Sequence, residues 1–184
     1  MQTGHGSLCD PIAFALRLLT ESNAALRVYQ DHAGLDRQRL WAHLDGEPHR
    51  WNILSGVDVL LADADSGEAV LVLEIEETAC SPKKLLGDIM ALSLCEYLTT
   101  ESDNRRYAVT PKTELWVCFP ANPRGHQRVR NERLLDRLQT VLGGTLPPEN
   151  IRLVLANNRD SLVDAVRDAL RRWVDARACD ERGP

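Results

Sequence analysis

Three acidic residues fall on two neighbouring segments that have the side-chain pattern of β-strands. Asp58 lies in residues 53–63, and Glu74 and Glu76 end the apolar run within residues 69–77. A turn sequence joins the two segments, which predicts an antiparallel hairpin. Because strand side chains alternate between faces, we expect Glu74 and Glu76 to share one face with Val72 and with Val70.

Carboxylates gathered in this way repel one another unless a cation or a lysine neutralises them. Oxygen ligands of this kind suit Mg²⁺, which binds through one or two carboxylates and keeps several waters. Glu74 directly follows four apolar residues, where a charge is costly without a partner. Lys83 and Lys84 follow closely in a chain with three lysines and nineteen arginines. The alternative is that these acidic residues are ordinary solvated residues at strand ends.

Other segments of the chain are expected to position these residues. Asp10 and Pro11 predict the start of a helix that continues, after a kink near residue 22, to Tyr29. Residues 40–44 fit either a short strand or a helical turn. Ser81 and Pro82 predict a helix to about residue 98, with Leu85, Leu86, Ile89, Leu92 and Leu94 facing inward.

The pattern in the second half of the chain predicts the order strand, helix, strand, helix. We expect a polar loop at 99–106, a strand at 115–119, a helix at 127–142, a strand at 151–156 and a helix from Asp160 to about 177. Strand–helix–strand units imply parallel neighbours, and the hairpin makes the sheet mixed. The fold class is therefore α/β, in one domain over residues 1–178, with a frayed tail at 179–184.

Composition narrows the class of protein. The chain has 184 residues, of which 43% are hydrophobic and 27% charged, as in globular proteins. It contains no long apolar run typical of a membrane span and no signal-peptide pattern. Its five cysteines are widely spaced, which predicts reduced thiols in the cytoplasm and argues against structural zinc.

Charge is distributed unevenly along the chain. The net charge is −5, yet residues 112–178 carry 12 Lys and Arg against 8 Asp and Glu, whereas residues 1–111 carry 9 against 17. This asymmetry permits a surface that faces a polyanion, although solvated helix faces would give the same count. Arg124, Arg128 and Arg130, followed by Arg133 and Arg137, are the best candidates for contacts with nucleic-acid phosphates.

The acidic pattern resembles the restriction-endonuclease-like PD-(D/E)XK nuclease superfamily. Residues 55–60, Ser-Gly-Val-Asp-Val-Leu, are similar to its first acidic strand, and residues 72–76, Val-Leu-Glu-Ile-Glu, to its second. The resemblance covers residues 10–120 in architecture and implies an αβββαβ core flanked by helices. The chain departs from the family motif at Glu76, which stands where the family commonly has lysine.

The resemblance also implies roles for individual residues. Asp58, Glu74 and the Ile75 carbonyl would bind Mg²⁺, or Mn²⁺ in its place. Glu76 would orient or deprotonate a water, or bind a second metal, and Lys84 would stabilise charge on the phosphate. Lys83 could replace Lys84, and Glu21 is a candidate accessory carboxylate, with a solvated helix residue as the alternative.

The function implied is that of a Mg²⁺-dependent endonuclease that hydrolyses DNA phosphodiester bonds, with RNA as the less favoured substrate. The alternative is an inactive nuclease-fold module for binding or assembly in a DNA-processing or defence complex. A third reading is an α/β domain without an active site. By analogy, the enzyme would act as a homodimer or as a subunit of a larger complex.

Overall fold

The fold is described from a computed structural model, which covers residues 8–31, 39–77, 81–120, 133, 137 and 150–180. The helices in these residues are α1 (Cys9–Thr20), α2 (Pro82–Leu94) and α4 (Leu162–Asp180). The strands are β1 (Leu26–Gln30), β2 (Leu40–His43), β3 (Ile53–Gly56), β4 (Val59–Asp63), β5 (Glu68–Ile75), β6 (Tyr97–Thr100), β7 (Arg106–Ala108), β8 (Glu114–Pro120) and β9 (Ile151–Ala156).

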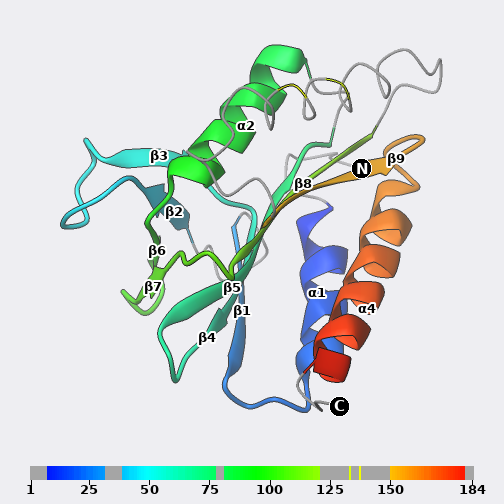
Figure 1. Cartoon of the computed structure of the whole chain (residues 1–184), viewed down its shortest axis with the longest axis horizontal. Helices are drawn as coiled ribbons and strands as arrows, with labels where there is room; N and C mark the ends of the chain where they lie inside the picture. The colour runs from blue at the N-terminus through cyan, green and yellow to red at the C-terminus, as the bar shows by residue number, and fades with distance from the viewer. Residues whose placement is uncertain are drawn as a thin grey trace.

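A mixed sheet forms the centre of the molecule. Its strands lie in the order β1, β4, β5, β8 and β9, and β4 runs antiparallel to both of its neighbours, whereas β5, β8 and β9 are parallel. Helices α1 and α4 cover one face, and α2 lies on the other (Figure 1). The predicted α/β fold with a mixed central sheet is therefore confirmed.

A second group of strands extends the sheet on the side of α2. Strand β2 pairs with β3 and β6, and β6 pairs with β7, all antiparallel. Strand β7 joins the central sheet through the parallel pairing of Ala108 with Glu68. Figure 1 shows this side sheet below α2 and away from α1 and α4. Residues 40–44, which fitted strand or turn, thus form strand β2.

Two apolar clusters pack on the two faces of the central sheet. One joins α1 and α4 to the sheet, and its fully buried members include Ile12, Leu16, Leu73, Trp116, Val166 and Leu170. The other joins α2 and the side sheet to the opposite face through Leu60, Val72, Leu85, Ile89, Leu98 and Val117. Together the two clusters fix α2 and α1 on opposite sides of β5.

The predicted hairpin is confirmed as β4 and β5. Val59 pairs with Leu73 and Leu61 with Leu71, but Ala62 pairs with Ala69, so Val70 is an extra residue in β5. Such a bulge reverses the facing of the residues beyond it. Val70 packs with the α1 face while Val72 packs with the α2 face, so the prediction that both share the face of Glu74 is wrong for Val70.

The first predicted helix is too long. Helix α1 ends at Thr20, and residues 26–30 form the separate strand β1, which pairs with β4. The helix also begins at Cys9, before Asp10, and the N–H of Leu8 donates to Glu77 Oε1 at 3.1 Å. Asp10 is therefore not the cap, and its carboxylate instead accepts a hydrogen bond from Gln30 at 2.7 Å.

Three further element boundaries differ from the prediction. The segment 53–63 is two strands, β3 and β4, which change partners on either side of Asp58. Helix α2 ends at Leu94, which is 40% exposed rather than inward-facing, and β6 and β7 occupy part of the predicted loop at 99–106. Helix α4 begins at Leu162, two residues after Asp160, and continues to Asp180.

Some predictions fall on residues outside the described ranges. Of the helix predicted at 127–142, Arg133 and Arg137 are described, and both have helical backbone conformation. Of the tail predicted at 179–184, Cys179 and Asp180 belong to α4. Among the described residues, no helix combines the length and the apolar character needed to cross a membrane.

Candidate active site

Asp58 lies in the short segment between β3 and β4, and its backbone and side chain both form hydrogen bonds with neighbouring segments. Its carbonyl oxygen accepts a hydrogen bond from the N–H of Asp31, just beyond β1, at 2.8 Å. Its carboxylate Oδ2 accepts one from the N–H of Ile75 at 2.6 Å. Val59 and Leu73 are the last paired residues of β4 and β5 on this side. Beyond them, the Asp58 carboxylate accepts from the N–H of Ile75 in place of a backbone carbonyl.

Glu74 lies on β5 beside Asp58, on the face covered by α2. Burial raises the pKa of Glu74 well above its ordinary value, and the charges of Asp58, Asp88 and Glu76 raise it further. The Asp58 carboxylate also lies close enough to accept a hydrogen bond from protonated Glu74, which raises the pKa of Glu74 further. The pair therefore holds a proton at pH values where a solvated carboxyl group has lost it.

Glu76 and Lys84 form an ion pair next to these two residues. Lys84 Nζ donates to Glu76 Oε2, and the Glu76 side chain is only 11% exposed. The N–H of Glu76 donates to the carbonyl of Cys118 at 2.8 Å, which fixes the end of β5 against β8. The Ser81 hydroxyl caps α2 by accepting from the N–H of Lys84 at 3.2 Å. The helix start thus positions the lysine over β5.

Asp88 is a member of the cluster that the sequence analysis did not identify. It lies one turn beyond Lys84 on the same face of α2, and its Oδ2 atom is buried without a hydrogen-bond partner in the described structure. Burial raises its pKa to about 6, with Glu76 and Asp58 raising it and Lys84 opposing them. Its spacing of four residues from Lys84 predicts a shared helix face, but the sequence alone does not show that this face meets β5.

Two buried thiols flank Asp58 on the side away from α2. Burial raises the pKa of Cys9, and the nearby Asp58 and Glu77 carboxylates raise it further, with a hydrogen bond to Asp58. Burial followed by the charges of Asp58 and Glu74 has the same effect on the pKa of Cys118. Both side chains therefore stay protonated at neutral pH, which excludes them as thiolate nucleophiles.

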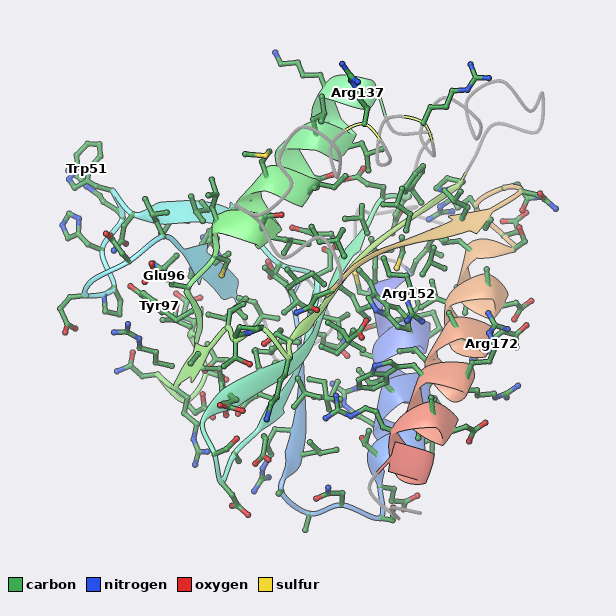
Figure 2. The ribbon with its side chains drawn as sticks, viewed as in Figure 1. Trp51, Glu96, Tyr97, Arg137, Arg152 and Arg172 are labelled. Carbon is green, nitrogen blue, oxygen red and sulfur yellow. The ribbon has the colours of Figure 1, made fainter. Side chains whose placement is uncertain are left out.

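The remaining predicted site residues lie elsewhere. Lys83 is exposed on α2, next to Lys84. Glu21 is exposed just past the end of α1, about 18 Å along the helix from Cys9, so the structure does not bring it to Asp58. Arg133 and Arg137 are exposed, and Figure 2 shows Arg137 projecting outward. Arg124, Arg128 and Arg130 lie outside the described residues.

The donor chemistry of the cluster suits a hard divalent cation. Asp58 and Glu74 supply two adjoining carboxyl groups, and the raised pKa of Glu74 shows that a positive charge between them would be favourable. Within the described parts of the chain, no three His, Cys, Asp or Glu side chains are arranged to hold an ion together. Mg²⁺ does not require three such side chains, because it retains waters and accepts backbone carbonyls such as that of Ile75.

Comparison of the chain with protein-family models, with curated proteins and with solved structures gives no match.

Proposed function

We propose that this protein is a Mg²⁺-dependent endonuclease that hydrolyses DNA phosphodiester bonds, of the PD-(D/E)XK type. The observation that carries the proposal is the placement of Asp58 next to Glu74 at the end of the β4–β5 pairing, beside the ion pair of Glu76 and Lys84. This arrangement supplies two ligands for a cation, one carboxylate for a water and one ammonium group for a phosphate.

The order of the elements supports the same proposal. Helix α1, strands β1, β4 and β5, helix α2 and strand β8 follow one another as α-β-β-β-α-β, with β2–β3 and β6–β7 as insertions. The superfamily core has this order. Lys84 also supplies, from α2, the positive charge that the family motif commonly places at the position of Glu76.

Each residue has a distinct part in the proposed reaction. A bound Mg²⁺ would lower the pKa of a water ligand and offset charge on the scissile phosphate. Asp58 and Glu74 would hold the cation after Glu74 loses its proton, and the N–H of Ile75 keeps Asp58 in place. Glu76 would orient the attacking water, and Lys84 would approach the phosphate as a compact cation.

A plasmid-cleavage assay tests the proposal. Wild-type protein with Mg²⁺ should nick or linearise the plasmid, and EDTA should stop the reaction. Asp58→Asn and Glu74→Gln should each reduce the rate by at least about a hundredfold, while Lys84→Arg retains part of it. Asp164→Asn, at an exposed position on α4, is the matched control. Full activity in folded Asp58→Asn and Glu74→Gln proteins would rule out this site.

A second candidate function is a non-catalytic binding or assembly module with the same fold. The observation that favours it is the exposure of Trp51, which is 78% exposed beside β3. The loop around it is ordered by Asn52, whose side chain bonds the backbone of His49 and Glu47. DNA binding without cleavage in Mg²⁺ or Mn²⁺ would support this alternative over the nuclease.

The proposal includes the cellular setting and the assembly. Three described cysteines, Cys9, Cys95 and Cys118, are buried free thiols, which supports the reducing cytoplasm as the location. Cleavage of both DNA strands in a single binding event is simplest with two active sites, so we propose a homodimer or a larger complex as the acting form. Size-exclusion chromatography with light scattering, with and without DNA, measures that state.

A further inference from the structure

A cavity of about 390 Å³ lies between the edge strand β1 and the turn that joins β6 to β7. It is lined by Arg27, Val28, Tyr29, Ser102, Asp103 and Arg105. The lining thus carries two guanidinium groups, two hydroxyls and one carboxylate around a space large enough for a phosphate group. None of these residues belongs to the carboxylate cluster described above.

The single carboxylate in the cavity already has its partners. Asp103 accepts hydrogen bonds from the hydroxyls of Thr100 and Tyr29, the latter at 3.0 Å, and its Oδ2 lies 3.5 Å from Arg105 Nε. Partial burial acts against ionisation, but these bonds outweigh it and hold the pKa of Asp103 below its usual range. Arg105 also contacts the Tyr107 hydroxyl, but its side chain is half-exposed, so its charge still faces the cavity together with that of Arg27.

Arg27 contributes a second positive charge from the edge strand β1. Among the described residues it has no ion-pair partner in the structure. Arg27 lies opposite Ala62 in β4, and Tyr29 lies opposite Leu60. Ala62 and Leu60 both pack in the cluster on the α2 face. Residues opposite each other in an antiparallel pair share a face, so Arg27 and Tyr29 point to the same side of the sheet as Glu74.

The cavity is formed before any ligand binds. The turn is closed by a hydrogen bond from the N–H of Thr100 to the carbonyl of Arg105 at 3.0 Å. The N–H of Arg105 donates in turn to the Thr100 hydroxyl at 3.2 Å. The hydroxyls of Tyr29 and Tyr107 lie 2.6 Å apart and tie the turn to β1. A preformed site of this kind loses little conformational entropy on binding.

Strand β1 connects this cavity directly to the candidate active site. The N–H of Asp31, just past the end of β1, donates to the carbonyl of Asp58, and Arg27 lies four residues earlier. At about 3.4 Å per strand residue, Arg27 lies roughly 14 Å along β1 from Asp31. This length is short enough for one nucleic-acid strand to reach both positions.

We infer that the cavity between Arg27 and Arg105 binds a backbone phosphate of the DNA strand, on one side of the bond that is cut. The inference rests on the proposed nuclease function for its ligand. The two guanidinium groups supply the charge, and the Ser102 hydroxyl supplies a neutral donor at the rim. The site would fix the position of the strand without reading a base, because contacts to phosphate carry no sequence information.

Salt-dependent DNA binding tests this inference. Fluorescence anisotropy with a labelled duplex, in EDTA to prevent cleavage, would compare wild type with the double variant Arg27→Gln/Arg105→Gln. Each phosphate contact adds about one to the slope of log affinity against log salt, so the double variant, which loses the one proposed contact, should lose about one. Arg171→Gln/Arg172→Gln removes the same charge from exposed positions on α4, where Figure 2 shows Arg172, and should leave the slope unchanged.

Several outcomes would overturn the inference. An unchanged slope in the folded Arg27→Gln/Arg105→Gln protein would do so, as would an equal loss in the α4 control. A third arm titrates inorganic phosphate and follows the backbone resonances of Ser102 and Tyr29 by NMR. Phosphate-induced shifts without any change in DNA binding would assign the cavity to a free phosphate compound and would also refute the DNA contact.

Failure of the nuclease proposal would look different. Cleavage that persists in Asp58→Asn, or no cleavage by wild type, combined with the loss of about one in the salt slope, would reject the catalytic site and keep the phosphate site. The two results come from different variants and different assays. Circular dichroism of the Arg27→Gln/Arg105→Gln protein, together with an Arg105→Lys variant that keeps the charge, guards against a change in fold.

Discussion

Replacing Asp88 by asparagine should stabilise the metal-free protein at neutral pH. The folded protein raises the pKa of Asp88 from 3.8 to about 6. An acid with a raised pKa loses stability as pH increases from its unfolded value to its folded value, because the unfolded chain releases the proton more readily. The wild-type protein should therefore become less stable between about pH 4 and pH 6, and Asp88→Asn should not follow that part of the decline.

The size of the effect follows from the shift. At about 1.4 kcal/mol per pKa unit, a change from 3.8 to about 6 corresponds to about 3 kcal/mol for a group fully shielded from water. Asp88 is half-buried, and solvent screening reduces the value to about 1.5 kcal/mol. We expect Asp88→Asn to exceed wild type in free energy of unfolding by about this amount above pH 7, and to match it near pH 3.5.

Urea unfolding in EDTA at pH values from 3.5 to 8 measures the difference. Asp164→Asn provides the control, since that side chain is 80% exposed on α4 and has no comparable cluster around it. Equal stability of wild type and Asp88→Asn at pH 7.5 would refute the electrostatic argument. A gain that stays constant from pH 3.5 to pH 8 would also refute it, since the gain would then have no link to ionisation.

Three further changes test other parts of the structure. Mg²⁺ should raise the melting temperature of wild type more at pH 8 than at pH 6, because the cation competes with the proton held by Glu74. Glu74→Gln should lose this response. Thermal shift with matched Ca²⁺ and EDTA samples measures the effect. Ser81→Ala should lower the free energy of unfolding by about 1 kcal/mol through loss of the α2 cap, as read from urea unfolding, and no loss would contradict the capping role. Leu16→Ala should lower the free energy of unfolding by about 3 kcal/mol, because Leu16 is fully buried. Leu18→Ala, at a position 56% exposed on the same helix, should lower it by less than about 0.5 kcal/mol. Similar losses in the two variants would contradict the described packing.

The parts of the fold that the sequence predicts are those with a strong local pattern. The alternation around Leu60 and the apolar run through Leu73 specify the β4–β5 hairpin, and residues 151–156 form β9 as predicted. Strand β1 was missed because Leu26 and Tyr29 are three residues apart, a spacing that also fits a helix. Pairing with β4 determines the conformation of this segment, and a contact so distant in sequence leaves no local signal.

The candidate site was predicted in part for the same reason. Asp58, Glu74 and Glu76 stand out because each interrupts or ends a strand, and Lys84 because lysine is rare in this chain. Asp88 did not stand out, since an aspartate on a helix is ordinary until the helix is placed against a sheet. Its significance arises from the packing of Leu85 and Ile89, which turns that side of α2 toward β5.

The hydrogen bond from Ile75 to Asp58 makes one backbone amide a natural spectroscopic sensor of the site. The Ile75 nitrogen lies 2.6 Å from Asp58 Oδ2. Metal binding or protonation of the Asp58 carboxylate would change the charge on that oxygen. The ¹⁵N–¹H resonance of Ile75 therefore reports occupancy and ionisation in one signal, without any label near the carboxylates. A single assigned spectrum would let a titration follow the site directly in the unmodified chain.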